Sequence, residues 1–154
     1  GLRSGTENIP AIVGMKKAVE IMQKEMDMEV KRFAQYRDKV IRGILETIPK
    51  CHLNGHPQER LANNAHFRFD GIEGESLLLS MKDKGISVST GSACTSKTLE
   101  ASHTLIALGL LHEEAHGSLQ LTCGRFNQPG DFEKVIEVLP GVVERLRKLS
   151  PIYR

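Results

Sequence analysis

A long run of apolar residues at helical spacing, from Met15 to Ile48, constrains the fold more than any other feature of the chain. Apolar positions recur every three or four residues with charged side chains between them, which is the period of an amphipathic helix. As one straight helix the run would be about 50 Å long, which exceeds an ordinary globular helix. We therefore expect either two helices with a break near Asp27 or one helix that links two bodies. Pro49 ends the pattern, and residues 1–14 are predicted to form an extended arm.

The rest of the chain mixes predicted strands and helices without strict alternation. Residues 64–70 and 119–123 alternate apolar and polar side chains, which indicates strands with one buried face. This mixture favours the α+β class, with a small, mostly antiparallel sheet covered by helices and preceded by the long helix. Two further short strands are expected, at 52–55 and 86–89. Helices are expected at 73–84 and at 104–108, the second with Ser102 as its N-cap. A last helix is expected to start at Asn127 or Asp131, to end at Leu149 and to bend at Pro140.

Length and composition exclude several classes of protein. A chain of 154 residues, 40% of them hydrophobic, makes one ordinary globular domain or a domain with an arm. The net charge of +2 and the scarcity of aromatic residues argue against nucleic-acid binding. No apolar run is long enough to span a membrane, and no signal peptide is recognised. The three cysteines lack CxxC spacing, so free thiols in the cytoplasm are expected rather than disulfides or a zinc site.

Cys94 is the candidate for chemistry among the cysteines. It stands in a predicted loop, residues 90–97, whose neighbours are small or carry hydroxyl groups, so the thiol is accessible and able to travel to a substrate. An incidental exposed cysteine is the alternative. Cys51 and Cys123 follow a helix end and a strand face, and both are expected to be small buried apolar residues.

Other polar groups give weaker signals. Gly5 and Thr6 form a small polar loop before the long helix, where a hydroxyl and backbone N–H groups suit a phosphate, although ordinary turns share this pattern. His112 and His116 are four residues apart but have no third ligand beside them, so no metal site is predicted. The basic residues near the C-terminus are expected to form a solvated helix face, with partner docking as the alternative: Arg145, Arg147, Lys148 and Arg154.

At residues 89–96 the sequence STGSACTS resembles the catalytic-cysteine loop of the NifS/IscS-type cysteine desulfurases, which are pyridoxal-phosphate (PLP) enzymes of the class V aminotransferase group. Further blocks match in family order, at residues 1–6, 73–77, 105–110, 115–118 and 145–151. The resemblance covers essentially the whole chain. It implies the C-terminal part of a fold type I PLP enzyme. Residues 1–26 would then be the end of the large PLP-binding domain and the linking helix, and residues 27–154 the small domain with the cysteine loop.

The resemblance also implies roles for individual residues. Cys94 matches the nucleophile that takes sulfur from L-cysteine, releases alanine and passes the persulfide to an iron–sulfur scaffold or another acceptor. Thr6 matches the threonine that reaches the PLP phosphate of the other subunit in a homodimer. The family's PLP lysine and its ring-binding histidine and aspartate lie upstream of the Gly5–Thr6 block and are absent from this chain. The chain alone is therefore expected to be inactive.

Gln120 departs from the family pattern. It stands where the family usually has an arginine that binds the substrate carboxylate, and an amide cannot supply the charged, bidentate fork of guanidinium. Arg125 would lie on the opposite face if the strand continued that far. With Gln120 the protein would handle cysteine differently, act on another substrate or be partly degenerate. Three hypotheses stay open: a fragment of a PLP-dependent cysteine desulfurase with Cys94 as sulfur acceptor, a non-catalytic homologue that offers Cys94 as a sulfur carrier or iron–sulfur cluster ligand, and a complete small thiol protein.

Overall fold

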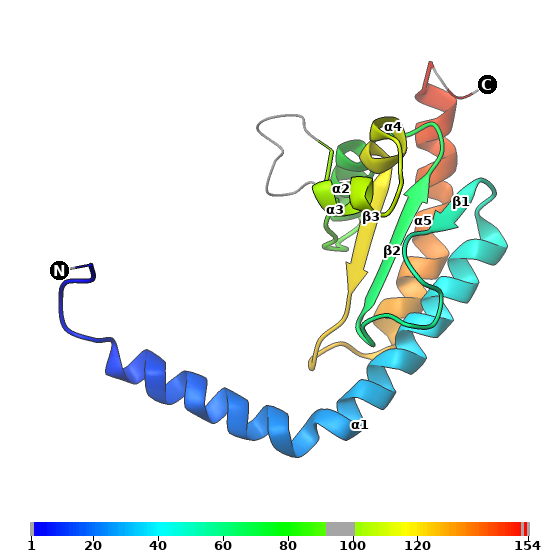
Figure 1. Ribbon diagram of the computed structural model, residues 1–154. Coiled ribbons are helices and arrows are strands. Elements are labelled where there is room, and N and C mark those ends of the chain that lie inside the picture. Colours follow the sequence, from blue (N-terminus) through cyan, green and yellow to red (C-terminus); the bar gives the residue numbers. More distant parts are fainter. Residues whose placement is uncertain (1, 92–100, 152, 154) are drawn as a thin grey trace.

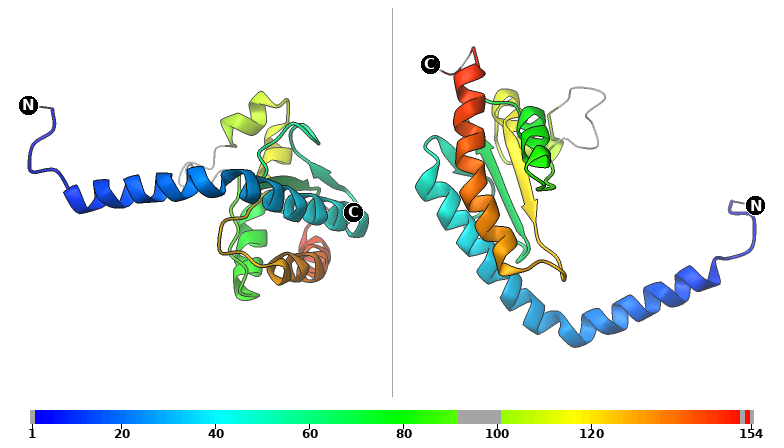
Figure 2. Two further views of the ribbon diagram at one scale, coloured as in Figure 1. Left: turned by 90° about the horizontal axis from the view of Figure 1, so that it is seen from below. Right: turned by 180° about the vertical axis from the view of Figure 1, so that it is seen from behind.

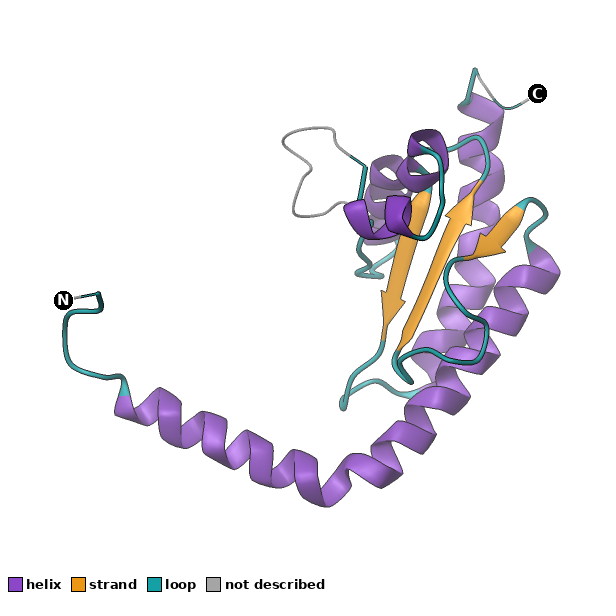
Figure 3. Ribbon diagram, viewed as in Figure 1, coloured by secondary structure: helices purple, strands orange, loops and turns teal. Residues whose placement is uncertain are grey.

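A three-stranded antiparallel sheet stands at the centre of the computed structural model, which describes residues 2–91, 101–151 and 153 (Figure 1). The strands follow the order β1-β2-β3, and both pairs are antiparallel (Figure 3). Helices α2 and α5 lie on one side of the sheet, and α3 and α4 lie on the other (Figure 2). The elements are β1 (Cys51–Leu53), β2 (Asn64–Phe69), β3 (Ser118–Thr122), α1 (Ile9–Thr47), α2 (Gly74–Asp83), α3 (His103–Ala107), α4 (His112–His116) and α5 (Pro129–Leu149).

The predicted alternation in β2 and β3 is confirmed and defines the core. Ala65, Phe67 and Phe69 are buried, as is Leu119 on the neighbouring strand. These side chains share one face of the sheet, because successive residues of a strand point to opposite sides. They pack against buried apolar residues from three helices, namely Val40, Ile44, Leu77, Met81, Val135, Leu139, Val142 and Val143. The opposite face of the sheet is polar.

The predicted strand at 86–89 is reduced to a single bridge. Only Ser89 pairs with the sheet, and its partner is Gln120. Residues 86–88 make no strand, although Ile86 and Val88 pack against the core. The predicted strand is therefore wrong for residues 86–88, but Ser89, the last residue of the segment, still pairs with the edge of β3.

The long apolar run forms one continuous helix, α1, so of the two expected arrangements the single helix is observed and a break near Asp27 is not. Figure 1 shows instead that α1 curves in its middle. The predicted arm is also shorter than residues 1–14, because α1 begins at Ile9. The side chain of Asn8 caps it by accepting the Ala11 N–H at 3.2 Å. Only the last part of α1 packs into the core, whereas Met22, in the N-terminal half, is 54% exposed.

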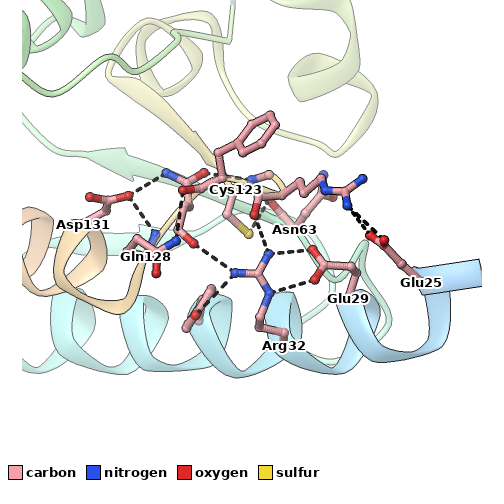
Figure 4. A network of polar contacts seen from close by, with 12 residues as sticks. Glu25, Glu29, Arg32, Asn63, Cys123, Gln128 and Asp131 are labelled. Atoms are coloured by element: carbon pink, nitrogen blue, oxygen red, sulfur yellow. Dashed lines mark hydrogen bonds and ion pairs between the residues drawn. The ribbon is translucent and has the colours of Figure 1, made fainter. Parts of the chain in front are cut away.

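Arg32 ties the middle of α1 to the loop between β3 and α5 (Figure 4). Its guanidinium donates to the carbonyl oxygens of Arg125 at 3.0 Å and Asn127 at 2.9 Å. The carboxylate of Glu29 accepts two hydrogen bonds from the same guanidinium, at 2.6 and 3.0 Å. Arg125 in turn pairs with Glu25 at 2.9 Å. The tertiary contacts of α1 with the sheet unit therefore begin near residues 25–32.

Helix α5 begins at Pro129, between the two predicted starts. The Asp131 carboxylate accepts the Gln128 N–H at 3.0 Å, which satisfies a free N–H at the helix start. The helix continues through Pro140 without interruption. No helix in the described part of the chain combines the length and the apolarity needed to cross a membrane.

Arg147 contradicts the prediction of a solvated basic face. Its side chain is buried, and its guanidinium donates to the carbonyls of Pro49 at 2.7 Å, Lys50 at 2.8 Å and Asp70 at 3.1 Å. Arg145, two residues earlier, donates to the Ser80 hydroxyl at 3.0 Å. Arg147 thus holds the C-terminal end of α5 against the residues that precede β1 and follow β2, whereas Arg145 and Lys148 are exposed as predicted.

Candidate functional site

The polar face of the sheet gathers four side chains from β2 and β3. The register places His66 opposite Gln120 and Arg68 opposite Ser118, and directly opposed residues of an antiparallel pair share a face. Ser89 extends the row, because its backbone donates to the Gln120 carbonyl at 3.2 Å and accepts the Gln120 N–H at 2.7 Å. Gln120, the residue that departs from the family pattern, therefore stands between Ser89 and His66.

Cys94 lies outside the described residues, but both flanks of residues 92–100 are described. On one side, the Gly91 N–H donates to the Ser118 hydroxyl at 3.2 Å. A Cβ at Gly91 would lie 2.7 Å from that hydroxyl oxygen and 2.8 Å from Leu105 Cδ1, so only glycine fits without a shift of its neighbours. On the other side, Ala101 is buried against Leu105 and Ala115. The flanks of the predicted nucleophile are thus fixed on the polar face.

A hollow opens between these flanks and the loop that precedes β2. Gly91 and Ser102 from the two flanks line it, together with His66 and Gln120 from the sheet. The remaining lining residues come from residues 54–64 and from α3: Asn54, Gly55, His56, Glu59, Arg60, Asn64, Thr104, Leu105 and Leu108. The structure therefore brings Gln120 into a cavity that is lined by both described flanks of residues 92–100.

His66 is held in one orientation by Asn54. Asn54 is buried, and its amide nitrogen lies 2.9 Å from His66 Nδ1. The Asn54 side-chain oxygen accepts from Arg68 Nη1 at 3.0 Å, which fixes the direction of the amide. Because the amide nitrogen can only donate, Nδ1 is the acceptor and the neutral ring carries its proton on Nε2. Burial, and secondarily the charge of Arg60, lower the pKa of His66 to about 4, so the ring is neutral near pH 7.

Sequence reasoning gave His66 no functional role. Its pattern placed the side chain on the polar face of a strand, which the structure confirms. What it lacked was the pairing register, which sets His66 against Gln120, and the contact with Asn54 twelve residues earlier. The sequence does contain an Asn and a His on consecutive predicted strand segments. That combination is common, so it does not single out His66 as a functional residue.

Thr6 and Arg125 do not join this site within one chain. Thr6 is exposed in the segment before α1, at the far end of that helix from the sheet (Figure 1). β3 ends at Thr122, and Arg125 beyond it pairs with Glu25 of α1 instead of lining the hollow. Arg125 is therefore no substitute for the arginine that position 120 lacks.

Cys123 is buried as predicted, whereas Cys51 is only partly buried. Burial raises the pKa of the Cys51 thiol to about 12, and it also raises that of Cys123. Cys123 lies at the end of β3 with its sulfur 3.8 Å from the Asn63 carbonyl oxygen (Figure 4). Both are protonated thiols near pH 7, which disfavours nucleophilic roles. Within the described residues no group of three or more His, Cys, Asp or Glu side chains is arranged for a metal ion.

Comparison with known proteins gives the family. The sequence model described as "Aminotransferase class-V" matches residues 1–119. The chain belongs to the class V aminotransferases. One similar protein is "Cysteine desulfurase IscS 1" of Archaeoglobus fulgidus, which is 57% identical over the whole chain. Another is "Cysteine desulfurase IscS" of Methanosarcina thermophila, which is 52% identical over 97% of the chain. The chain spans 40% and 37% of the lengths of these two class V relatives.

A solved structure supports the fold assignment for this class V chain. A structure titled "NIFS-LIKE PROTEIN" superposes with a TM-score of 0.81 at 27% identity, over 95% of this chain and 36% of the other. The expectation of a NifS/IscS-type fold, an α+β unit preceded by a long helix, is confirmed. The class also implies dependence on PLP, which makes the fit of this chain's residues to that cofactor the next question.

The hydrogen-bonding groups that line the hollow are suited to binding a substrate rather than the whole PLP cofactor. Amide, imidazole and hydroxyl groups line it, but no lysine that could bind an aldehyde is among its lining residues. At the other end of the chain, Thr6 follows Gly5, whose φ of 92° opens the turn, and its exposed hydroxyl suits a phosphate. The residues of this chain thus fit two parts of a PLP site: Thr6 is suited to bind the cofactor phosphate, and the hollow is suited to face the substrate.

Proposed function

We propose that the chain forms the sulfur-accepting part of a PLP-dependent cysteine desulfurase, with Cys94 as the nucleophile. The observation that carries this proposal is the anchoring of Gly91 and Ala101, which flank the Cys94 segment, beside the hollow that contains Gln120. The names of the relatives support the same activity, and the non-catalytic alternative is not favoured because those relatives are similar over the whole chain. The acceptor class that we propose is an iron–sulfur scaffold or another sulfur-accepting protein.

The chemistry required of this chain is a transfer of sulfur between two thiols. When bound, PLP supplies an electron sink that activates the amino acid. The Cys94 thiolate attacks the sulfur of L-cysteine, so a sulfur–sulfur bond forms while the carbon–sulfur bond of the substrate breaks. The carbon keeps the electron pair and takes up a proton, alanine leaves, and Cys94 holds the persulfide. The thiol must therefore reach both a pocket and an acceptor surface.

The division of the chain follows the same proposal. Residues 1–26 would belong to the large PLP-binding domain and the linking helix, and residues 27–154 to the small domain. Thr6 would contact the PLP phosphate of the other subunit of a homodimer, which agrees with its distance from the sheet in its own chain (Figure 1). The lysine that binds PLP would come from polypeptide outside this sequence, so the 154 residues alone would not turn over.

The test uses the full-length protein with PLP and L-cysteine, and it measures alanine release and persulfide on the protein. We expect Cys94→Ala to abolish both, and Cys123→Ala, which alters a buried thiol, to leave both close to wild type. Alanine release by the Cys94→Ala variant at the wild-type rate would refute the nucleophile. No alanine release by the wild-type protein would refute the activity itself.

A further inference from the structure

We infer that His66 is a second substrate-binding residue: with Gln120 it presents a pair of uncharged hydrogen-bond donors to the carboxylate of the amino-acid substrate. The inference rests on the proposed function, which supplies an amino acid as the substrate. It concerns how the hollow binds that carboxylate when position 120 carries an amide. The two side chains come from neighbouring strands and line the same cavity.

The register brings the two donors close enough to share one ligand. Directly opposed residues of an antiparallel pair have Cβ atoms about 4.5–5.5 Å apart. His66 and Gln120 are such a pair. A carboxylate has two oxygens, and two donors on adjacent strands can each bind one of them. This arrangement replaces the two parallel N–H groups that a single guanidinium would offer.

The proton of His66 is on the correct nitrogen for this role. Asn54 donates to Nδ1, so Nε2 carries the hydrogen. Nε2 faces Gly91, because a Cβ at that glycine would lie 3.4 Å from it. His66 and Gly91 both line the hollow, and no hydrogen bond from Nε2 is found among the residues that the structure describes. The N–H is therefore available to a ligand in the hollow.

The charges around the hollow favour an anion. The Arg60 guanidinium lines the hollow while donating to the backbone carbonyls of Asn54 and His56. Glu59 is the one carboxylate among the lining residues, and it is exposed. The site thus combines neutral donors at its floor with a cation in its wall. It suits a carboxylate held by hydrogen bonds beside a positive charge.

The experiment compares L-cysteine with its uncharged carboxamide, L-cysteine amide, in the full-length protein with PLP. The quantity measured is the ratio of kcat/KM for the two substrates. We expect His66→Ala to raise the KM for L-cysteine about tenfold and to lower the ratio by a similar factor, because one hydrogen bond to a charged group is lost. The matched control is His112→Ala in α4, which removes an exposed imidazole that does not line the hollow.

A rescue variant separates carboxylate binding from a structural role. In the double variant His66→Ala/Gln120→Arg, a guanidinium at position 120 is expected to restore the ratio to wild type or above. Should His66→Ala fold poorly, His66→Phe, which keeps a ring in the place of the imidazole but has no N–H donor, is expected to give the same loss. An active wild-type protein whose ratio is unchanged in both His66 variants would overturn this inference alone, and so would failure of the arginine to rescue. A wild-type protein inactive on L-cysteine would overturn the proposed function instead.

Discussion

Ser89 and Gln120 exchange both of their backbone hydrogen bonds, at 3.2 and 2.7 Å, although Ser89 belongs to no strand. This single bridge joins the segment that leads to Cys94 to the strand that carries the proposed substrate residue. Gly91, two residues further on, is fixed to the same strand by the hydroxyl of Ser118. The position of the segment is thus set by β3 itself, and changes at these contacts should affect sulfur transfer.

Gly91→Ala is expected to slow persulfide formation and to destabilise the fold by about 1–3 kcal/mol, because the added methyl would stand 2.7 Å from the Ser118 hydroxyl oxygen. Denaturant unfolding and the rate of persulfide formation in the full-length protein measure the two effects. The matched control is Gly141→Ala in α5, where a Cβ meets nothing within 4 Å. That change should leave the fold as stable or raise its stability by up to about 1 kcal/mol. Equal behaviour of the two variants would contradict the close approach at Gly91.

Arg147→Met is expected to lower the free energy of unfolding by about 3 kcal/mol, because three backbone carbonyls lose their donor in a buried site. Arg147→Lys should recover only part of the loss, since an ammonium cannot reproduce the planar set of donors. The control is Lys148→Met, which alters a side chain that is 73% exposed. Chemical denaturation measures all three variants. A loss no larger than that of the control would show that the three hydrogen bonds add nothing to stability.

The sequence predicted which side chains of a strand or helix are buried better than it predicted which distant residues they contact. The alternation around Phe67 and Leu119 gave both faces of the sheet, because it depends only on neighbouring residues. Arg147 was misassigned, because its acceptors, Pro49 and Asp70, lie far away in the sequence and none of them is a side-chain group. The sequence left open whether α1 breaks near Asp27. The helix is continuous there, and Glu25 and Arg32, on either side of Asp27, both contact the loop between β3 and α5. Local pattern does not report such contacts.

The role of His66 was missed for the same reason. Its pairing with Gln120 depends on strand register, which the sequence left open, and its tautomer depends on the buried amide of Asn54. Gln120 itself was found through resemblance to the family, and the structure adds the hollow around it. The prediction for Cys94 stays untested in geometry, because that residue lies outside the described ranges.

The burial of His66 predicts a pH dependence of stability. Its pKa falls from the ordinary value of 6.5 to about 4 in the folded chain. Between these values the unfolded chain binds the proton and the folded chain does not, so stability decreases as the pH falls through this window. The loss is up to about 3 kcal/mol at pH 4 and is absent above pH 7. His66→Asn should remove this part of the pH dependence. Unfolding free energies of both proteins between pH 4 and 8 measure it, and identical slopes would contradict the buried neutral imidazole.

Residues 27–154 are expected to unfold in one cooperative transition without residues 1–26. The buried part of α1 begins only at Val40, and the Arg32 contacts to the β3–α5 loop remain in the shorter chain. The deletion removes the Glu25–Arg125 pair, a largely exposed contact whose loss costs about 1 kcal/mol or less. It also removes the exposed apolar side chains of the N-terminal half of α1, so the shorter chain should self-associate less than the full 154 residues.

Circular dichroism during denaturation and sedimentation velocity measure these two outcomes. The control is Arg32→Ala in the shorter chain, which cuts the contact of α1 with the Asn127 carbonyl and should lower the midpoint of unfolding. A sharp transition for residues 27–154, with a lower midpoint for the Arg32 variant, would support a unit that begins near Asp27 and is held there by the arginine. Loss of all structure on deletion would mean that the N-terminal half of α1 contributes to folding despite its exposure, and the proposed division of the chain would then be wrong.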